Sequence, residues 1–275
     1  MNTTIRPLAR LPGSGARGML VFDIHGVLLG RREPAGHRPA GEVLARLRSA
    51  GYTMAFVTNG SSVTQEQLAA KLQAAGVQAE PDQIVTAAMV MAERVARLPG
   101  PRRLFVIGSD ALREQVSRRL QSRAHWVAPE EADTVLVSRD PALCEDTLER
   151  LRRARAPLLL ATCRDARFPS ESCIDIGPGP TVDRVEAALG LPVQVVGKPD
   201  PFVLTQVLGI APAQLRHTVV VGDSPEQDVA LARRARARSV LLMAPGAKVP
   251  TGPETRPDHA ITALDALWSV LELRE

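Results

Sequence analysis

Four short polar stretches follow apolar runs along the chain, and their side chains could together bind a phosphoryl group and a metal ion. The stretches are Asp23–Gly26, Thr58–Gly60, Gly197–Pro199 and Gly222–Asp228. Each comes after an apolar run of buried type, at the position where open α/β sheets hold their ligands. Together they supply separated carboxylates, a hydroxyl, a lysine and glycine-flanked backbone amides, which suit a phosphoryl group beside a hard cation.

The carboxylates divide into a candidate nucleophile and candidate metal ligands. Asp23 ends an apolar run, and Gly26 lets the backbone turn away from it. This carboxylate could attack phosphorus, or it could serve only as a metal ligand. Asp223, with Asp228 behind it, could bind Mg²⁺, which prefers octahedral oxygen coordination and needs only one or two protein carboxylates. Asp223 and Asp228 are therefore candidate Mg²⁺ ligands.

The second and third stretches carry candidate phosphate-binding groups. Thr58, together with the amides around Asn59 and Gly60, could hold phosphoryl oxygens. Lys198 could neutralise both the nucleophile and the transferring group, which matters most where water is excluded. Lysine is scarce in this chain, since Lys71, Lys198 and Lys248 are its only lysines and all other fixed cationic side chains are arginines.

The alternation of apolar runs with helix-period segments predicts βα units and a mainly parallel sheet. We expect strands at 19–23, 53–57, 83–86, 103–107, 134–138, 157–162, 193–196, 219–223, 239–243 and 257–261, and helices at 40–50, 62–75, 87–98, 110–121, 141–154, from 181 and at 264–273. The run between the second and third stretches contains no candidate site residue. We therefore predict a discontinuous first domain, residues 1–86 and 190–275, interrupted by a second domain at 87–189.

Composition is that of a soluble globular protein, with 45% hydrophobic and 23% charged residues. No apolar stretch approaches the roughly 20 residues that span a bilayer, and the first 18 residues lack the apolar block of a signal peptide. Cys144, Cys163 and Cys173 have no Cys-x-x-Cys spacing, so we expect reduced thiols and a cytoplasmic protein. Cys163 is predicted to be a small, semi-buried residue at a strand end and not a reactive thiol.

Charge does not indicate a nucleic-acid partner. The net charge is only +4, and the arginines lie among acidic residues on helix faces that we expect to be solvated. An aromatic content of 3% leaves little on which bases could stack. We expect neither a nucleic acid nor a membrane as partner. A homodimer is compatible with the sequence, which does not decide the oligomeric state.

The four stretches in this order resemble the haloacid dehalogenase superfamily of phosphotransferases, and most closely its NagD-like branch (class IIA). The resemblance covers nearly the whole chain and includes Gly26-Val27-Leu28, Thr58-Asn59-Gly60-Ser61-Ser62, Ile107-Gly108-Ser109, Gly197-Lys198-Pro199, Gly222-Asp223 to Asp228, Pro245-Gly246 and Pro257-Asp258. It implies an α/β fold with a Rossmann-like core, a mainly parallel sheet and an inserted α/β cap domain of the C2 type.

The same resemblance implies roles for the candidate residues. Asp23 would be the nucleophile, and Thr58 and Lys198 would bind phosphate. Asp23, Asp223 and the backbone carbonyl of residue 25 would ligate Mg²⁺. Asp228 would be a further ligand or a support close to the metal.

His25 departs from the resemblance, because typical phosphatases of the family carry an aspartate at this position. That aspartate protonates the leaving oxygen and then activates water against the aspartyl-phosphate. An imidazole, with an ordinary pKa of about 6.5, could perform both steps near neutral pH. Two other outcomes stay open: a leaving group that needs less protonation, such as a phosphonate carbon, and a slow or inactive site kept for binding.

We therefore expect a Mg²⁺-dependent phosphomonoesterase that acts on a small phosphorylated metabolite through an aspartyl-phosphate intermediate. His25 would stand at the acid–base position, with Lys198 assisting catalysis. The alternatives are a non-catalytic or very slow phosphometabolite-binding protein on the same fold, and a hydrolase for phosphonates or other substrates. The sequence identifies neither the substrate nor the cap residues that select it.

Overall fold

The structure is a computed structural model, and it describes residues 17–30, 36–155, 157–169 and 174–272. Most of the first 18 residues, Cys173 and the end of the predicted last helix lie outside these residues. The chain divides into two compact units. Asn59–Thr64 and Thr86–Gly197 form the five-stranded unit, and the described residues of Arg6–Thr58, Gln65–Val85 and Lys198–Glu275 form the six-stranded unit.

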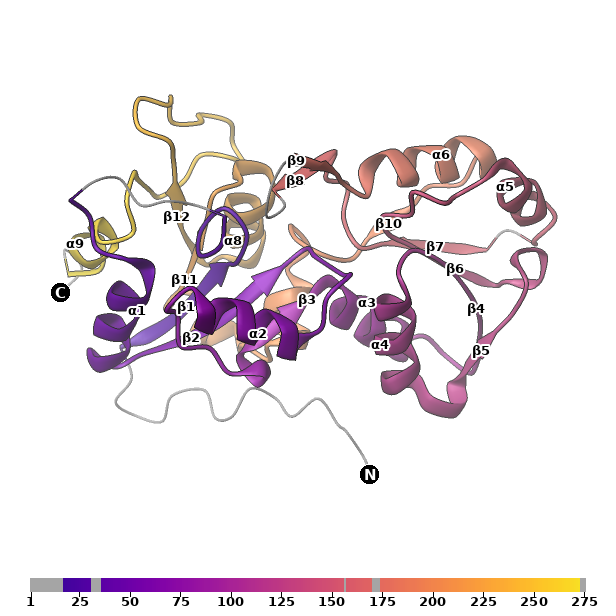
Figure 1. Ribbon diagram of the computed structural model, residues 1–275, viewed down its shortest axis with the longest axis horizontal. Helices are drawn as coiled ribbons and strands as arrows, with labels where there is room; N and C mark the ends of the chain where they lie inside the picture. Colours follow the sequence, from indigo (N-terminus) through magenta and orange to yellow (C-terminus); the bar gives the residue numbers. More distant parts are fainter. Residues whose placement is uncertain (1–16, 31–35, 156, 170–173, 273–275) are drawn as a thin grey trace. The chain divides into compact units, whose positions relative to one another are not determined.

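The six-stranded unit has the sheet order β13-β12-β11-β1-β2-β3. Figure 1 labels five of these strands, β12, β11, β1, β2 and β3. Its helices and strands are β1 (Gly18–Asp23), α1 (Ala40–Ser49), β2 (Tyr52–Thr58), α2 (Gln65–Ala74), β3 (Ile84–Thr86), α7 (Pro212–Leu215), β11 (Thr218–Gly222), α8 (Ala230–Ala235), β12 (Arg238–Leu242), β13 (His259–Ile261) and α9 (Ala266–Glu272). The predicted strand at 257–261 is confirmed as the edge strand β13.

Strand β1 lies inside this sheet and pairs in parallel with both β2 and β11. All six of its residues are buried, which explains its continuous apolar sequence. The parallel registers place Phe22 opposite Phe56 of β2 and opposite Val221 of β11. Because parallel strands end at the same edge, the polar residues that follow these three strands gather there.

The five-stranded unit has the sheet order β10-β7-β6-β4-β5, and a separate antiparallel pair joins β8 to β9. Its helices and strands are α3 (Ala87–Ala96), β4 (Arg102–Ile107), α4 (Asp110–Leu120), β5 (Ala124–Trp126), β6 (Thr134–Val137), α5 (Glu145–Arg152), β7 (Leu158–Ala161), β8 (Arg167–Pro169), β9 (Ile174–Ile176), α6 (Gly179–Leu189) and β10 (Gln194–Val195). Its core is aliphatic and includes Val135, Leu151, Leu159 and Val182.

The predicted domain boundaries differ from the compact units at two places. Strand β10, expected to open the second part of the first domain, pairs in parallel with β7, with Gln194 opposite Leu160. The segment Asn59–Thr64, also expected in the first domain, belongs to the five-stranded unit. The apolar run at 193–196 has the composition of a buried strand, and composition does not specify which sheet such a strand joins.

Several predicted helices begin later than expected, and several short strands were not predicted. Helix α5 begins at Glu145 and not at 141, and α2 begins at Gln65 and not at 62. The three-residue strands β5, β8 and β9 were not predicted. Among the helices that the structure describes, none combines the length and apolarity that a bilayer crossing requires.

We predict that the stacked pair Phe22 and Phe56 fixes the ends of β1 and β2. The rings have centroids 6.3 Å apart, and both side chains are 0% exposed. Phe56→Ala should lower the free energy of unfolding by about 3–5 kcal/mol, because it removes buried apolar area and leaves a cavity. Urea denaturation measures the change. Val249→Ala, at a side chain that is 49% exposed, should change it by less than about 0.5 kcal/mol, and an equal loss in both variants would contradict the prediction.

Candidate active site

A buried lysine joins two buried carboxylates at the carboxyl edge of the six-stranded sheet. Lys198 Nζ donates to Asp23 Oδ1 at 2.7 Å and to Asp228 Oδ1 at 2.7 Å. Lys198 is 3% exposed, Asp23 8% and Asp228 2%. Charges this deeply buried are tolerated only when they are paired, so each group depends on the other two.

Different elements bring the three side chains together. Asp23 is the last residue of β1, and Asp228 lies in the π-helical turn Pro225–Val229 that follows β11. The parallel pairing of β1 with β11 therefore carries both carboxylates to one edge. Backbone Ser224 N donates to Asp228 Oδ2 at 3.1 Å, which orients the second oxygen of that carboxylate. Short π-helical segments of this kind are frequent at functional sites.

Two glycines allow the carboxylates to approach the backbone closely. A Cβ added to Gly26, which has φ +84°, would lie 2.0 Å from Asp223 Oδ2. One added to Gly222 would lie 2.1 Å from Asp228 Cγ. A side chain at either position would push an aspartate out of place. The glycines are therefore part of the construction of the site and not only turn residues.

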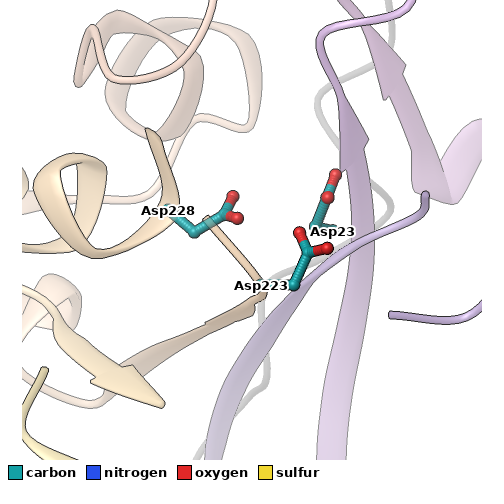
Figure 2. A group of neighbouring side chains, drawn as sticks. All are labelled: Asp23, Asp223 and Asp228. Atoms are coloured by element: carbon teal, nitrogen blue, oxygen red, sulfur yellow. The ribbon is translucent and has the colours of Figure 1, made fainter. Parts of the chain in front are cut away.

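The three aspartates form a donor set that fits a divalent cation. Figure 2 shows Asp23, from the end of β1, together with Asp223 and Asp228, from the stretch that follows β11, and one oxygen of each lies within 4.8 Å of the others. Asp223 is exposed, unlike the other two aspartates. Desolvation by the surrounding atoms, and then the negative charges of Asp23 and Asp228, still raise its pKa to about 7. Three carboxylates facing one ammonium leave an excess of negative charge. A hard cation that prefers oxygen ligands, such as Mg²⁺, would neutralise it.

Burial and neighbouring charges also determine the protonation of Lys198 and Asp228. Burial disfavours the charged form of Lys198, but Asp228 and Asp23 outweigh it and raise the pKa of the ammonium. Burial raises the pKa of Asp228, although Lys198 opposes this shift. Lys198 is therefore a fixed cation at every physiological pH.

His25 contacts the predicted phosphate-binding threonine. Its Nδ1 lies 3.2 Å from Thr58 Oγ1, and either atom can be the donor, depending on the imidazole tautomer. Burial, and then the positive charges of Lys198 and Lys71, lower the pKa of His25. The contact occupies Nδ1, so Nε2 is the ring nitrogen that can exchange a proton with a ligand.

The structure brings most of the predicted site residues into one unit, but not all of them. Asp23, His25, Thr58, Lys198, Asp223 and Asp228 belong to the six-stranded unit. Asn59 and Gly60 belong to the five-stranded unit, where the Gly60 carbonyl accepts a hydrogen bond from Ala87 N at 3.1 Å.

Sequence reasoning missed a group of buried hydroxyls in the five-stranded unit, on Ser61, Ser138 and Thr162. Ser138 and Thr162 directly follow strands β6 and β7, so the polar-residue-after-strand signal used for the other motifs could have found them. Cys163 is buried as a strand-end residue, and burial raises the pKa of its thiol far above the ordinary value, so it is not a reactive thiolate.

Comparison with known proteins identifies relatives over most of the chain. A family model described as haloacid dehalogenase-like hydrolase matches residues 20–119, and a related HAD-hydrolase-like model matches residues 195–267. Human chronophin is 34% identical over 265 residues, which cover 85% of this chain and 86% of chronophin. The 5′-nucleotidase YutF of Bacillus subtilis (strain 168) is 25% identical over 252 residues, covering 90% of this chain and 96% of YutF.

A solved structure agrees with this result. The crystal structure of the glycerol phosphate phosphatase Rv1692 from Mycobacterium tuberculosis in complex with magnesium matches with a TM-score of 0.76 and 26% identity. The match covers 90% of this chain and 76% of that chain. The fold is thus shared over most of both chains.

We predict that Lys198→Met destabilises the metal-free protein strongly, because it leaves two buried carboxylates without a counter-charge. The free energy of unfolding should fall by about 3–5 kcal/mol at pH 8. The loss should be smaller at pH 5. Without the ammonium, the carboxyl pKa values in the folded protein exceed those of the unfolded chain, so the folded state gains protons and stability as the pH falls.

Denaturation in EDTA-containing buffer at both pH values measures this difference. Lys248→Met, at an exposed lysine, is the matched control and should change stability by less than about 0.5 kcal/mol. A loss in Lys198→Met that is the same at pH 5 and pH 8 would contradict the prediction.

Proposed function

Because the chain belongs to the haloacid dehalogenase-like hydrolases, in the NagD-like branch of phosphatases, we propose that it is a Mg²⁺-dependent phosphomonoesterase for a small phosphorylated metabolite. The six-stranded unit would be the catalytic core, and the five-stranded unit would be the cap. The observation that carries the proposal is the contact of Lys198 with both Asp23 and Asp228, at 2.7 Å each, beside Asp223. This arrangement places a candidate nucleophile, a fixed cation and metal-binding oxygens together.

In the first step of the proposed reaction, Asp23 acts as nucleophile. A carboxylate oxygen of Asp23 forms a bond to phosphorus, and the bond from phosphorus to the leaving oxygen breaks. Lys198 keeps a positive charge beside the nucleophile, because its ammonium is bound to Asp23 Oδ1 and does not lose its proton at neutral pH. Thr58 and the amides of Asn59 and Gly60 would bind the phosphoryl oxygens.

In the second step, water hydrolyses the aspartyl-phosphate. The oxygen of water bonds to phosphorus, the bond from phosphorus to the Asp23 oxygen breaks, and His25 Nε2 takes the proton of water. The contact between His25 Nδ1 and Thr58 Oγ1, 3.2 Å long, orients the imidazole for this role. The proton that His25 gains would return to a leaving oxygen in the next turnover.

Asp23, Asp223 and the carbonyl of His25 would hold Mg²⁺, with Asp228 beside them. When bound, this ion supplies positive charge to the phosphoryl oxygens and to the developing charge of the transition state. The named relatives include a 5′-nucleotidase and a glycerol phosphate phosphatase, so nucleoside monophosphates and glycerol phosphates belong in the first substrate panel. We further propose a cytoplasmic location, where such metabolites are available.

We expect Mg²⁺-dependent phosphate release from at least one phosphoester in a panel that also contains phosphonates. Asp23→Asn should lower the turnover by at least about 10³-fold, because it removes the nucleophile. Asp82→Asn, at an exposed aspartate of the same unit, is the matched control and should leave turnover unchanged. Colorimetric phosphate detection with and without EDTA makes the measurement.

The panel also separates the alternatives. A folded wild-type protein that binds Mg²⁺ and phosphate but releases no product would favour a non-catalytic binding protein, in which His25 replaces the usual acid–base aspartate. Activity on phosphonates alone would favour cleavage of carbon–phosphorus bonds. Turnover that survives Asp23→Asn would contradict the aspartyl-phosphate mechanism directly.

His25→Ala should lower turnover by about 10²–10⁴-fold, the usual contribution of a general acid–base group. The loss should be greater for an alkyl ester such as glycerol phosphate than for 4-nitrophenyl phosphate, whose leaving group needs less protonation. Steady-state kinetics with both substrates tests this, with His125→Ala at an exposed histidine as control. A His25→Asp variant that gains orders of magnitude in turnover, combined with full activity of Asp23→Asn, would show that the wild-type site does not use this machinery.

A further inference from the structure

The carboxyl edge of the five-stranded sheet holds a segment of the chain itself. The strand order is β10-β7-β6-β4-β5. Along the chain, β5 is added on one side of β4, and β6, β7 and β10 follow on the other side, so the order switches sides between β6 and β4. Parallel sheets of this order bind ligands outside the carboxyl ends of the strands at such a switch. Here the residues that follow these strands contact Asn59–Thr64, the segment directly after Thr58.

Three hydrogen bonds from three places hold this segment. Ser61 Oγ lies 2.7 Å from Ser138 Oγ, which follows β6. Ser109 Oγ, which follows β4, donates to the Ser61 carbonyl at 3.4 Å. Ala87 N, at the start of α3, donates to the Gly60 carbonyl at 3.1 Å. The segment is thus fixed by both a side chain and its backbone.

The same hydroxyl network reaches the other phosphate-binding stretch. Thr162, directly after β7, donates from Oγ1 to Ser138 Oγ at 3.1 Å. The carbonyl of Thr162 accepts a hydrogen bond from Gly197 N at 3.0 Å. Ser61 is 7% exposed, Ser138 2% and Thr162 0%. Because these hydroxyls are buried, water cannot replace a lost partner without a structural change.

We propose that Ser138 is a positioning residue that aligns the two phosphate-binding stretches, a role that rests on the proposed phosphatase function. Thr58 immediately precedes the segment that Ser138 holds, and Lys198 immediately follows Gly197. Consecutive Cα atoms are about 3.8 Å apart, so a fixed residue restricts its neighbour closely. Ser138 does not touch the reacting atoms. It acts through Ser61 on one stretch and through Thr162 on the other.

The test compares Ser138→Ala, Ser61→Ala and the double variant with Ser122→Ala, at an exposed serine of the same unit. Isothermal titration calorimetry in saturating Mg²⁺ measures the affinity for inorganic phosphate, and a separate titration measures the affinity for Mg²⁺. Ser138→Ala should weaken phosphate binding about tenfold. Mg²⁺ affinity should stay within about twofold, because the hydrogen bonds of Ser138 go to Ser61 and Thr162 and not to the carboxylates proposed to hold the ion. Ser122→Ala should change neither affinity.

The double variant distinguishes positioning from general destabilisation. If the two serines act through one bond, the double variant should bind phosphate about as weakly as either single variant. Phosphate affinity within twofold of wild type in Ser138→Ala would overturn the inference, as would fully additive losses. If Ser138→Ala fails to fold, a tenfold loss in folded Ser61→Ala with Mg²⁺ affinity unchanged supports the inference, and an unchanged phosphate affinity overturns it.

These binding measurements do not require turnover, so the two proposals can fail separately. An inactive wild type whose phosphate affinity still depends on Ser138 would overturn the phosphatase function and support the positioning role. An active wild type whose phosphate affinity does not change in Ser138→Ala would support the phosphatase function and overturn the positioning role. A wild type that binds no phosphate would overturn both.

Discussion

The site depends on one buried ammonium held between two buried carboxylates. Lys198 is 175 residues from Asp23 along the chain, yet their atoms lie 2.7 Å apart. Each of these groups alone would be costly to bury, and only the complete set removes the penalty. Correct pairing of β1 with β11 and correct placement of Lys198 are therefore requirements of stability as well as of chemistry. A chain that misplaces any one of the three groups loses both.

Lysine suits this position better than the arginine that the chain uses almost everywhere else. A compact ammonium can donate in separate directions to Asp23 and Asp228, whereas a planar guanidinium presents a fork suited to one carboxylate. The ammonium neutralises only part of the negative charge. Desolvation, and then the remaining charges of Asp23 and Asp228, raise the pKa of Asp223 to about 7. The protein thus carries a site that is electrostatically incomplete until a cation binds.

The sequence predicted the parts of the site that follow from strand ends and failed where tertiary pairing decides. Asp23 and Asp223 follow long buried runs, whose parallel pairing makes the meeting of their ends predictable. The run before Lys198 has the same apolar pattern, yet its strand β10 joins the other sheet. The apolar composition of a strand does not specify which strand it pairs with. The Ser61–Ser138 contact could not be foreseen, since serines are common and only the fold brings these two together.

At two places beside the candidate site, the chain passes from one compact unit to the other. Movement of a residue on one side of such a place affects its neighbour on the other side. The compact units divide at Thr58–Asn59 and at Gly197–Lys198, so each division falls within one of the stretches proposed to bind phosphate. A peptide bond is planar and short, and it transmits a displacement of Asn59 or Gly197 to the adjoining residue. The five-stranded sheet fixes both Asn59–Thr64 and Gly197 through its own strand ends. Thr58 and Lys198 therefore each lie within two residues of a backbone group that is held by a hydrogen bond within the five-stranded unit.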